Sequence, residues 1–175
     1  MKDWDEGVGR AYESGVFVTP PVRGWTPAHS RLDLLALADG PTDPGFLPWF
    51  AALSRRLGEV QLFVNERGWS HHGWVSAVDG EIVRAFAISD GAIPLFVGEV
   101  TAAERELGRG FRTYTKADLE VWGDDEFDAW VDQMPREQDV LRLAGRWSVD
   151  PWAIDLAEVR GPGLFGTPAK DRVAA

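Results

Sequence analysis

The residues best suited to chemistry lie in one short cluster, Gly68-Trp69-Ser70-His71-His72-Gly73, which sets a hydroxyl nucleophile beside two imidazoles. A nucleophile elbow requires the pattern G-x-S-x-G on a turn between a strand and a helix. The cluster departs from that pattern by one residue and lies between two expected strands. Sequence adjacency also says little, because the fold brings the catalytic histidine of a hydrolase to its serine. We therefore predict no catalytic residue in this chain, and no hydrolytic role for Ser70 or His72.

Metal binding is not expected from the sequence either. His71 and His72 would point to opposite faces of a strand, so the two imidazoles cannot readily share one ion. A calcium loop that started at Asp124 would place Ala129 where glycine is needed and Pro135 where the bidentate glutamate belongs. The glycine pairs near both ends of the chain lack the other residues of a dinucleotide or phosphate loop. The sequence thus predicts neither a metal nor a cofactor.

Arg84 is the most informative charged residue of the chain. It lies in an apolar run with Ile82, Phe86 and Ile88, where a charge must find a partner. One explanation is a structural ion pair, or a side chain that reaches the end of its strand. The other is a guanidinium at the floor of a small-molecule pocket, where it would bind a carboxylate in a bidentate manner. The walls of that pocket would be Trp69 and Trp74.

The element that must position these residues is a β-meander over residues 60–99. Two apolar runs flank Asp79-Gly80, a dipeptide that suits a two-residue type I′ turn because both of its central residues need φ > 0. The resulting register pairs residues across the hairpin: Val78 with Glu81, Ser76 with Val83, and Trp74 with Ala85. The other face would carry Val75, Ala77, Ile82, Arg84, Phe86 and Ile88. Since both faces are mostly apolar, we expect a central hairpin that is covered on two sides.

Helices are expected before and after this meander. Pro48 suits the first turn of a helix over residues 48–57, and Gly58 suits its left-handed cap. Thr101 and Glu104 have the spacing of a capping box. The remaining predicted elements are a strand at 16–19, a strand at 31–38 for which a helical turn fits equally well, a helix at 125–132, and helices that start at Pro135 and at Asp150-Pro151.

This order of elements, with strands first and helices later, predicts an α+β fold in which helices pack against an antiparallel β-meander. We expect a single domain over residues 1–175. Residues 1–15 would be a loose N-terminal arm, and residues 160–175 a flexible tail rich in glycine and proline. Hydrophobic residues make up 45% of the chain and charged residues 26%, which is typical of a folded globular domain.

The expected cellular location of the protein follows from features that the sequence lacks. There is no cysteine, which excludes disulfides and thiolate metal sites and fits a cytoplasmic protein. The acidic N-terminus has no apolar core of the kind found in secretory signals. No apolar run reaches the roughly 18 to 20 residues that cross a bilayer. We therefore expect a cytoplasmic protein that does not bind membranes.

The net charge of −10 is concentrated in residues 114–159, which contain twelve acidic and four basic residues. Nucleic acid is an unfavourable ligand for such a surface, because the phosphate backbone requires a basic stripe. A basic protein partner would be favoured electrostatically. The alternative is that the charge serves solubility alone.

Tryptophan is unusually frequent, with nine residues. Large side chains of this kind fill cores, and they also form binding hot spots. Within the acidic region, Trp122 and Trp130 flank Asp124, Asp125 and Asp128. We therefore predict a binding surface from these five residues, in addition to Trp69, Trp74 and Arg84.

Three stretches together resemble a group of uncharacterised bacterial proteins: WVSAVDGEIVRAF at 74–86, TAAE at 101–104 and LAGRWSVDP at 143–151. The resemblance implies no catalytic residues. At the level of the fold, small acidic α+β proteins of this kind are similar to immunity proteins of bacterial toxin systems. The sequence therefore predicts a non-enzymatic, immunity-type binding protein, with a small-molecule-binding protein or enzyme around Arg84, Trp69 and Trp74 as the alternative. It does not indicate the oligomeric state.

Overall fold

The computed structural model describes residues 3–32, 34–35, 43–66, 71–89, 91–111 and 116–167. The chain divides into two compact units, one formed by Met1–Asp33 with Ser148–Ala175 and the other by Leu34–Trp147. The expectation of a single domain stays a prediction. Among the described residues, no helix combines the length and apolar character that a membrane crossing requires.

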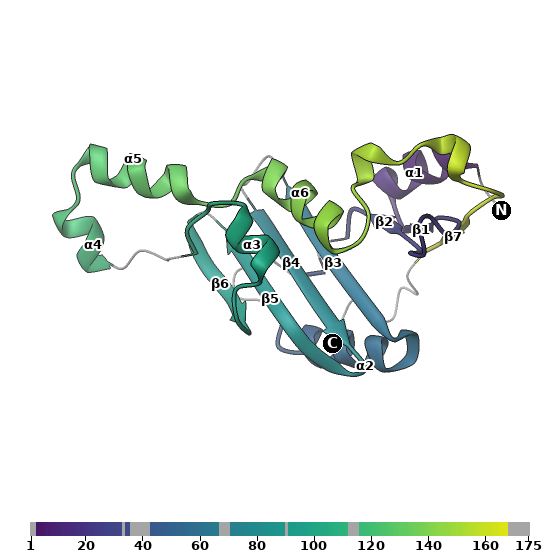
Figure 1. The fold of residues 1–175 in the computed structure, drawn as a ribbon, viewed down its shortest axis with the longest axis horizontal. Coiled ribbons are helices and arrows are strands. Elements are labelled where there is room, and N and C mark those ends of the chain that lie inside the picture. The colour runs from purple at the N-terminus through teal and green to yellow at the C-terminus, as the bar shows by residue number, and fades with distance from the viewer. Residues whose placement is uncertain are drawn as a thin grey trace. The chain divides into compact units, whose positions relative to one another are not determined.

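The smaller unit is a three-stranded antiparallel sheet with one α-helix (Figure 1). Its strands are β1 (Val16–Val18), β2 (Ala28–Ser30) and β7 (Leu164–Gly166), in the order β2-β1-β7. Its helices are α1 (Trp4–Glu13) and the 3-10 turns η2 (Pro151–Ala153) and η3 (Leu156–Glu158).

Three predictions for this unit need correction. Residues 1–15 contain α1 instead of a loose arm, because Asp3 caps the helix by accepting a hydrogen bond from the Glu6 N–H at 2.8 Å. The predicted tail contributes β7, which pairs with β1. Asp150 does act as an N-cap, but the helix it begins is only the 3-10 turn η2.

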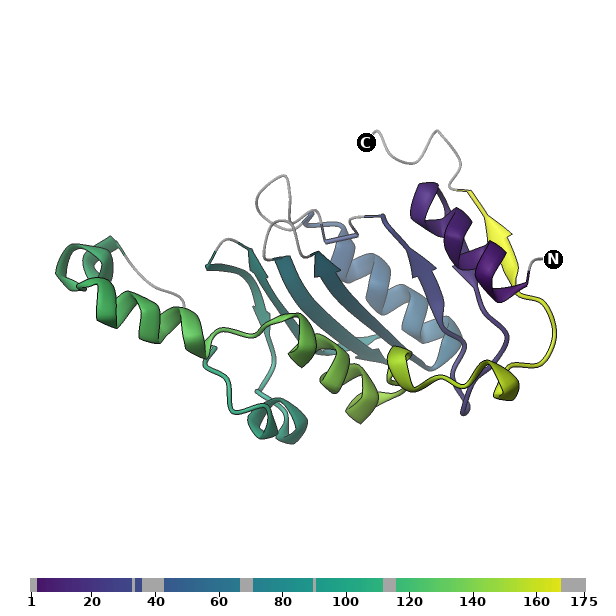
Figure 2. The same cartoon turned by 90° about the horizontal axis from the view of Figure 1, so that it is seen from above.

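The larger unit is an antiparallel sheet in meander order, with helices on both faces, and this confirms the predicted α+β fold (Figure 2). The strands are β3 (Glu59–Glu66), β4 (His71–Val78), β5 (Glu81–Ser89) and β6 (Ala92–Val97). The helices are α2 (Phe46–Leu57), α3 (Ala102–Glu106), α4 (Lys116–Val121), α5 (Asp124–Gln133) and α6 (Glu137–Trp147).

The turn at Asp79-Gly80 is confirmed, with φ of 49° at Asp79 and 95° at Gly80. Positive φ at both central residues is the geometry of a type I′ turn. Helix α2 also stabilises the turn, because the Gly80 N–H donates a hydrogen bond to Ser54 Oγ of α2 at 2.9 Å.

The predicted register holds at the turn but is wrong beyond Ile82. Val78 pairs with Glu81 as expected, but Ser76 pairs with Arg84 and Trp74 with Phe86. A β-bulge causes the shift, because Val83 is an extra residue on β5 and its side chain is 52% exposed. Arg84 therefore lies on the same face as Trp74 and Ser76, and not with Val75 and Ala77.

Each face of the central hairpin packs into a hydrophobic core of its own. The prediction that the hairpin is covered on both faces is therefore confirmed. One core lies between the sheet and α2, and it contains Phe46, Phe50, Val75, Ala77, Ala85, Ala87 and Leu95. The other lies between the opposite face and the later helices, and it contains Trp74, Phe86, Ile88, Trp130, Met134, Val140 and Leu143.

The predicted helix at 48–57 begins two residues earlier, at Phe46, and ends as expected before Gly58, whose φ is 86°. Its buried stripe is Phe46, Phe50 and Ser54, whereas Trp49 and Leu57 are exposed. The capping box of Thr101 and Glu104 at the start of α3 is confirmed. Of the predicted strand at 31–38, residues 33 and 36–38 lie outside the described residues; Arg31 and Leu32 have no regular secondary structure, and Leu34 and Leu35 lie in a turn.

The first prediction concerns the turn that sets this register. Gly80→Val should lower the free energy of unfolding by about 1 kcal/mol or more, because a β-branched residue resists positive φ. Gly80→Asn is the matched control, since asparagine tolerates this conformation and should cost less. Urea denaturation of both variants measures the difference, and equal stabilities would contradict the assigned turn.

Candidate functional site

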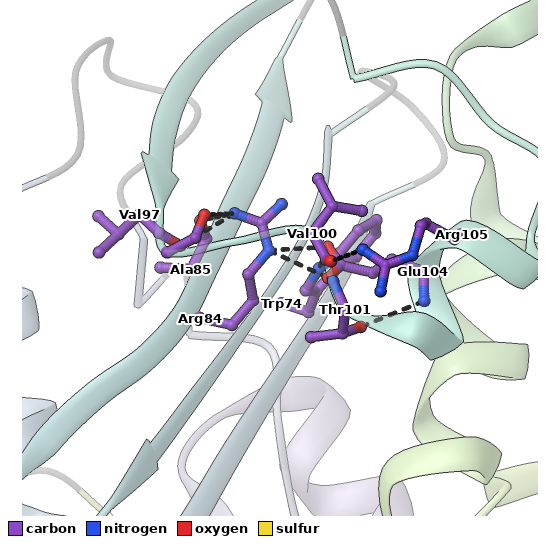
Figure 3. Close-up of polar contacts among 9 residues, drawn as sticks. Trp74, Arg84, Ala85, Val97, Val100, Thr101, Glu104 and Arg105 are labelled. Atoms are coloured by element: carbon purple, nitrogen blue, oxygen red, sulfur yellow. Dashed lines mark hydrogen bonds and ion pairs between the residues drawn. The ribbon is translucent and has the colours of Figure 1, made fainter.

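Arg84 is held by a buried ion pair with Glu104 (Figure 3). Its Nε donates to Glu104 Oε1 at 2.9 Å and to Oε2 at 3.1 Å, and both side chains are 0% exposed. Glu104 reaches this position because it is the third residue of α3, where the capping box fixes its side chain. The ion pair thus joins the bulged strand β5 to the first turn of α3.

The rest of the Arg84 guanidinium is also surrounded by protein. Its Nη1 donates to the backbone carbonyls of Val97 at 2.9 Å and Ala85 at 3.1 Å. The guanidinium carbon lies 4.3 Å from the centroid of the Phe96 ring, a cation–π distance. Nη2 has no hydrogen-bond partner among the described residues. Of the two explanations for Arg84, the contacts support a structural ion pair.

Trp74 shares the same carboxylate. Its Nε1 donates to Glu104 Oε1 at 2.7 Å, and its side chain is fully buried. Glu104 Oε2 also accepts from the Thr101 N–H at 2.7 Å. Neither Trp74 nor Arg84 therefore presents its polar group to solvent, and the predicted pocket wall Trp69 lies outside the described residues.

A cavity of about 370 Å³ nevertheless borders Arg84. It lies at the end of the sheet that carries the bulge, and it is lined by β3, β4, β5, the N-cap of α3 and the C-terminal end of α6. Gln61, Ser76 and Thr101 supply its polar groups, and Val83 and Trp147 supply apolar surface. The sequence did not indicate this set, because the bulge that turns Ser76 and Arg84 to one face has no clear signature in the apolar pattern.

The second candidate is the α5 surface, which we define as Asp124, Asp125, Phe127, Asp128 and Val131. Helix α5 contains five acidic residues and no basic one. Asp124, Asp125 and Asp128 are all exposed, and among the described residues no ion pair reaches them. Acids in a first turn stabilise a helix through its macrodipole, but Asp128 lies beyond that turn.

The aromatic residues of this region divide between the core and the surface. Trp130 is buried in the second core, and Trp122 is half-buried beside it. Phe127 is 39% exposed, and its ring centroid lies 5.7 Å from that of Trp130. Of these three aromatic side chains, Phe127 is therefore the exposed one, and the two tryptophans are buried or half-buried.

Val131 and Trp152 are among the exposed apolar residues that sequence reasoning did not single out. Val131 is 40% exposed and lies one helical turn after Phe127, a spacing that is visible in the sequence once the helix is known. Trp152, in the smaller unit, is 71% exposed. Its position after Asp150-Pro151 predicted a helix but gave no signal of exposure.

His72 is a buried titratable group on the same sheet face as Trp74. Burial lowers its pKa from the ordinary value, and this effect outweighs the nearby carboxylates of Glu137 and Asp139. Its Nδ1 has no hydrogen-bond partner among the described residues. Within that same part of the chain, no group of three or more histidines and carboxylates is arranged to hold a metal.

Comparison with known proteins found no matching family model, no matching curated protein and no matching solved structure. The function proposed below therefore depends on the geometry and charge of the two candidate sites.

The second prediction tests the ion pair. Glu104→Gln should lower the free energy of unfolding by roughly 3 to 5 kcal/mol, because it leaves the buried Arg84 charge without a counter-charge. The double variant Arg84→Met, Glu104→Gln buries no charge and keeps an acceptor for Trp74. Its loss should be smaller than the sum of the two single losses, which urea denaturation of all three variants measures. Strictly additive losses would show that the two side chains do not interact.

The third prediction concerns pH. Because the pKa of folded His72 is lowered, its contribution to stability is present above the unfolded pKa of about 6.5 and is lost as the pH falls below it. His72→Gln should therefore flatten the decline in unfolding free energy between about pH 7 and pH 5. The same substitution at His29 of the smaller unit, whose pKa is also lowered by burial, should flatten the decline as well. An unchanged slope in His72→Gln would contradict the assignment.

Proposed function

We propose that this protein is a non-enzymatic binding protein that docks a basic protein partner on the α5 surface. The observation that carries the proposal is that α5 joins three exposed acids without an ion pair among the described residues, Asp124, Asp125 and Asp128, to exposed apolar side chains at Phe127 and Val131. A helix that served only solubility would bury its apolar residues and expose its charges. Here part of the apolar face stays in water.

The charge of the α5 surface supports an association that is steered electrostatically. Asp124, Asp125 and Asp128 lie within two turns of one helix, so their fields add over a short distance. Of the other acids in α5, Asp132 is paired with Arg136 at 2.6 Å. The partner surface that complements this arrangement is basic.

The apolar side chains would anchor such a partner once it had docked. Phe127 and Val131 are one helical turn apart and share a face of α5. Aromatic residues that lose their remaining exposure at an interface are frequent hot spots. The partner should therefore carry an apolar contact point flanked by lysine or arginine residues.

Within this class, an immunity-type protein that covers a basic toxin is the form that the resemblance to bacterial immunity proteins supports. We place this activity in the cytoplasm and expect neither nucleic acid nor a membrane as a partner. The small-molecule alternative around Arg84, Trp69 and Trp74 is less well supported, because Arg84 and Trp74 are both bound to Glu104.

The fourth prediction identifies the partner and then tests the charge. A photo-reactive amino acid at Val131 should cross-link a basic protein in the native cells, whereas the same group at Leu57, an exposed apolar residue of α2, should not. Changing Asp124, Asp125 and Asp128 together to Asn should then slow association with that protein by about tenfold at low salt. The wild-type rate should fall steeply between about 0.1 M and 1 M salt, because the Debye length falls from about 10 Å to about 3 Å.

The matched control removes three exposed carboxylates outside α5, at Asp5, Glu81 and Glu99, and should leave the rate close to that of wild type. Circular dichroism of the α5 variant checks that the helix persists, since the acids also stabilise its first turn. An unchanged association rate and an unchanged salt dependence in the α5 variant would show that the charge serves solubility alone.

A further inference from the structure

The cavity beside Arg84 is lined by both polar and apolar side chains, and it has no part in docking on α5. It lies where the row of Gln61, Ser76 and Arg84 crosses three strands. Thr101 and Trp147 border it from the ends of α3 and α6. Its volume of about 370 Å³ is at the lower end of the range of roughly 300 to 1,000 Å³ found for small-molecule sites.

Gln61 leaves an acceptor unused in this lining. Its Nε2 donates to Glu59 Oε1 at 2.8 Å and to the Trp147 carbonyl at 3.3 Å. Because both neighbours are acceptors, they fix the orientation of the amide. The Gln61 Oε1 is then buried without a hydrogen-bond partner among the described residues. A ligand that reaches it must donate a hydrogen bond.

Two hydroxyl groups of the lining can both donate and accept. Ser76 is 8% exposed, and its hydroxyl makes no hydrogen bond within the described part of the chain. Thr101 Oγ1 accepts from the Glu104 N–H at 3.2 Å, which leaves its own hydrogen to donate. The cavity lining therefore contains uncharged hydrogen-bond donors and acceptors, namely the hydroxyls of Ser76 and Thr101 and the amide oxygen of Gln61.

The arginines of the lining already have counter-charges in the fold. Arg84 is paired with Glu104, and Arg146 is paired with Glu106 at 2.6 Å. The carboxylate of Glu59 accepts from Gln61. A charged ligand would have to compete with these partners, whereas a neutral ligand would leave them in place.

Apolar surface completes the lining. Val83, the bulged residue, is 52% exposed, and the half-buried Trp147 of α6 also lines the cavity. A sugar ring combines C–H faces that pack on such surface with hydroxyls that both donate and accept. We infer that this cavity binds a neutral polyhydroxylated ring, of the monosaccharide class, through Gln61, Ser76 and Thr101.

The test is a titration of the ¹⁵N-labelled full chain with D-glucose and, separately, with maltotriose, followed by NMR. The signals of the Gln61 side-chain amide, the Thr101 backbone amide and the Trp147 indole should shift in a saturable manner. Ser76→Ala should weaken the binding about fivefold, the value of one neutral hydrogen bond, whereas Ser14→Ala, which removes an exposed hydroxyl from the end of α1, should not. Tighter binding of maltotriose would assign the site to a sugar chain, and equal binding to a single ring.

A second variant keeps the inference falsifiable if Ser76→Ala disturbs the strand. Gln61→Met keeps the length of the side chain and removes the acceptor, and it should weaken the binding by a similar factor. The absence of any saturable shift at these three residues up to about 100 mM of either probe would overturn the inference. Unchanged dissociation constants in both variants would overturn it as well. Variants of α5 have no bearing on these outcomes, so failure here leaves the docking proposal intact.

Discussion

The buried charge of Arg84 is the constraint on which the larger unit depends. A guanidinium with no exposure to solvent must find acceptors, and Glu104, Ala85 and Val97 supply them from three places in the chain. Glu104 can do so only where the first turn of α3 lies against the sheet. Because the same carboxylate also binds Trp74 and caps α3, one side chain links the sheet, the helix and the core. Such a network fixes relative positions even where its net contribution to stability is small.

The bulge at Val83 makes this arrangement possible. In an unbroken ladder Arg84 would share a face with Val75 and Ala77, in the core that α2 covers. A charge there would have only apolar neighbours. By adding one residue to β5, the bulge moves Arg84 to the face of Trp74, and it leaves Val83 exposed beside the cavity. The ion pair and the cavity therefore have one structural cause.

The sequence predicted the parts of this fold that local chemistry determines. Asp79-Gly80 and the capping box of Thr101 and Glu104 each depend on a few adjacent residues, and each was correct. The helix also ends before Gly58 as predicted, but the ψ of −90° at Gly58 lies outside the left-handed helical region, so the expected left-handed cap is wrong. The register beyond Ile82 was wrong because a bulge is decided by what both faces must pack against, and not by the pattern of one strand. The sequence predicted that Arg84 needs a partner. It did not predict that this partner is Glu104, because twenty residues separate the two. The same limit applies to the cavity, whose lining comes from five elements.

In helix α5, acidic residues alone do not identify a binding surface. Asp124 and Asp125 lie in its first turn, where their charge stabilises the helix, so their presence has a local explanation. Trp130 also has one, since it completes the second core. These explanations do not cover Asp128, Phe127 and Val131, which contribute neither to the cap nor to full burial. Folding thus leaves these three exposed residues of α5 unexplained, and the proposed docking depends on them.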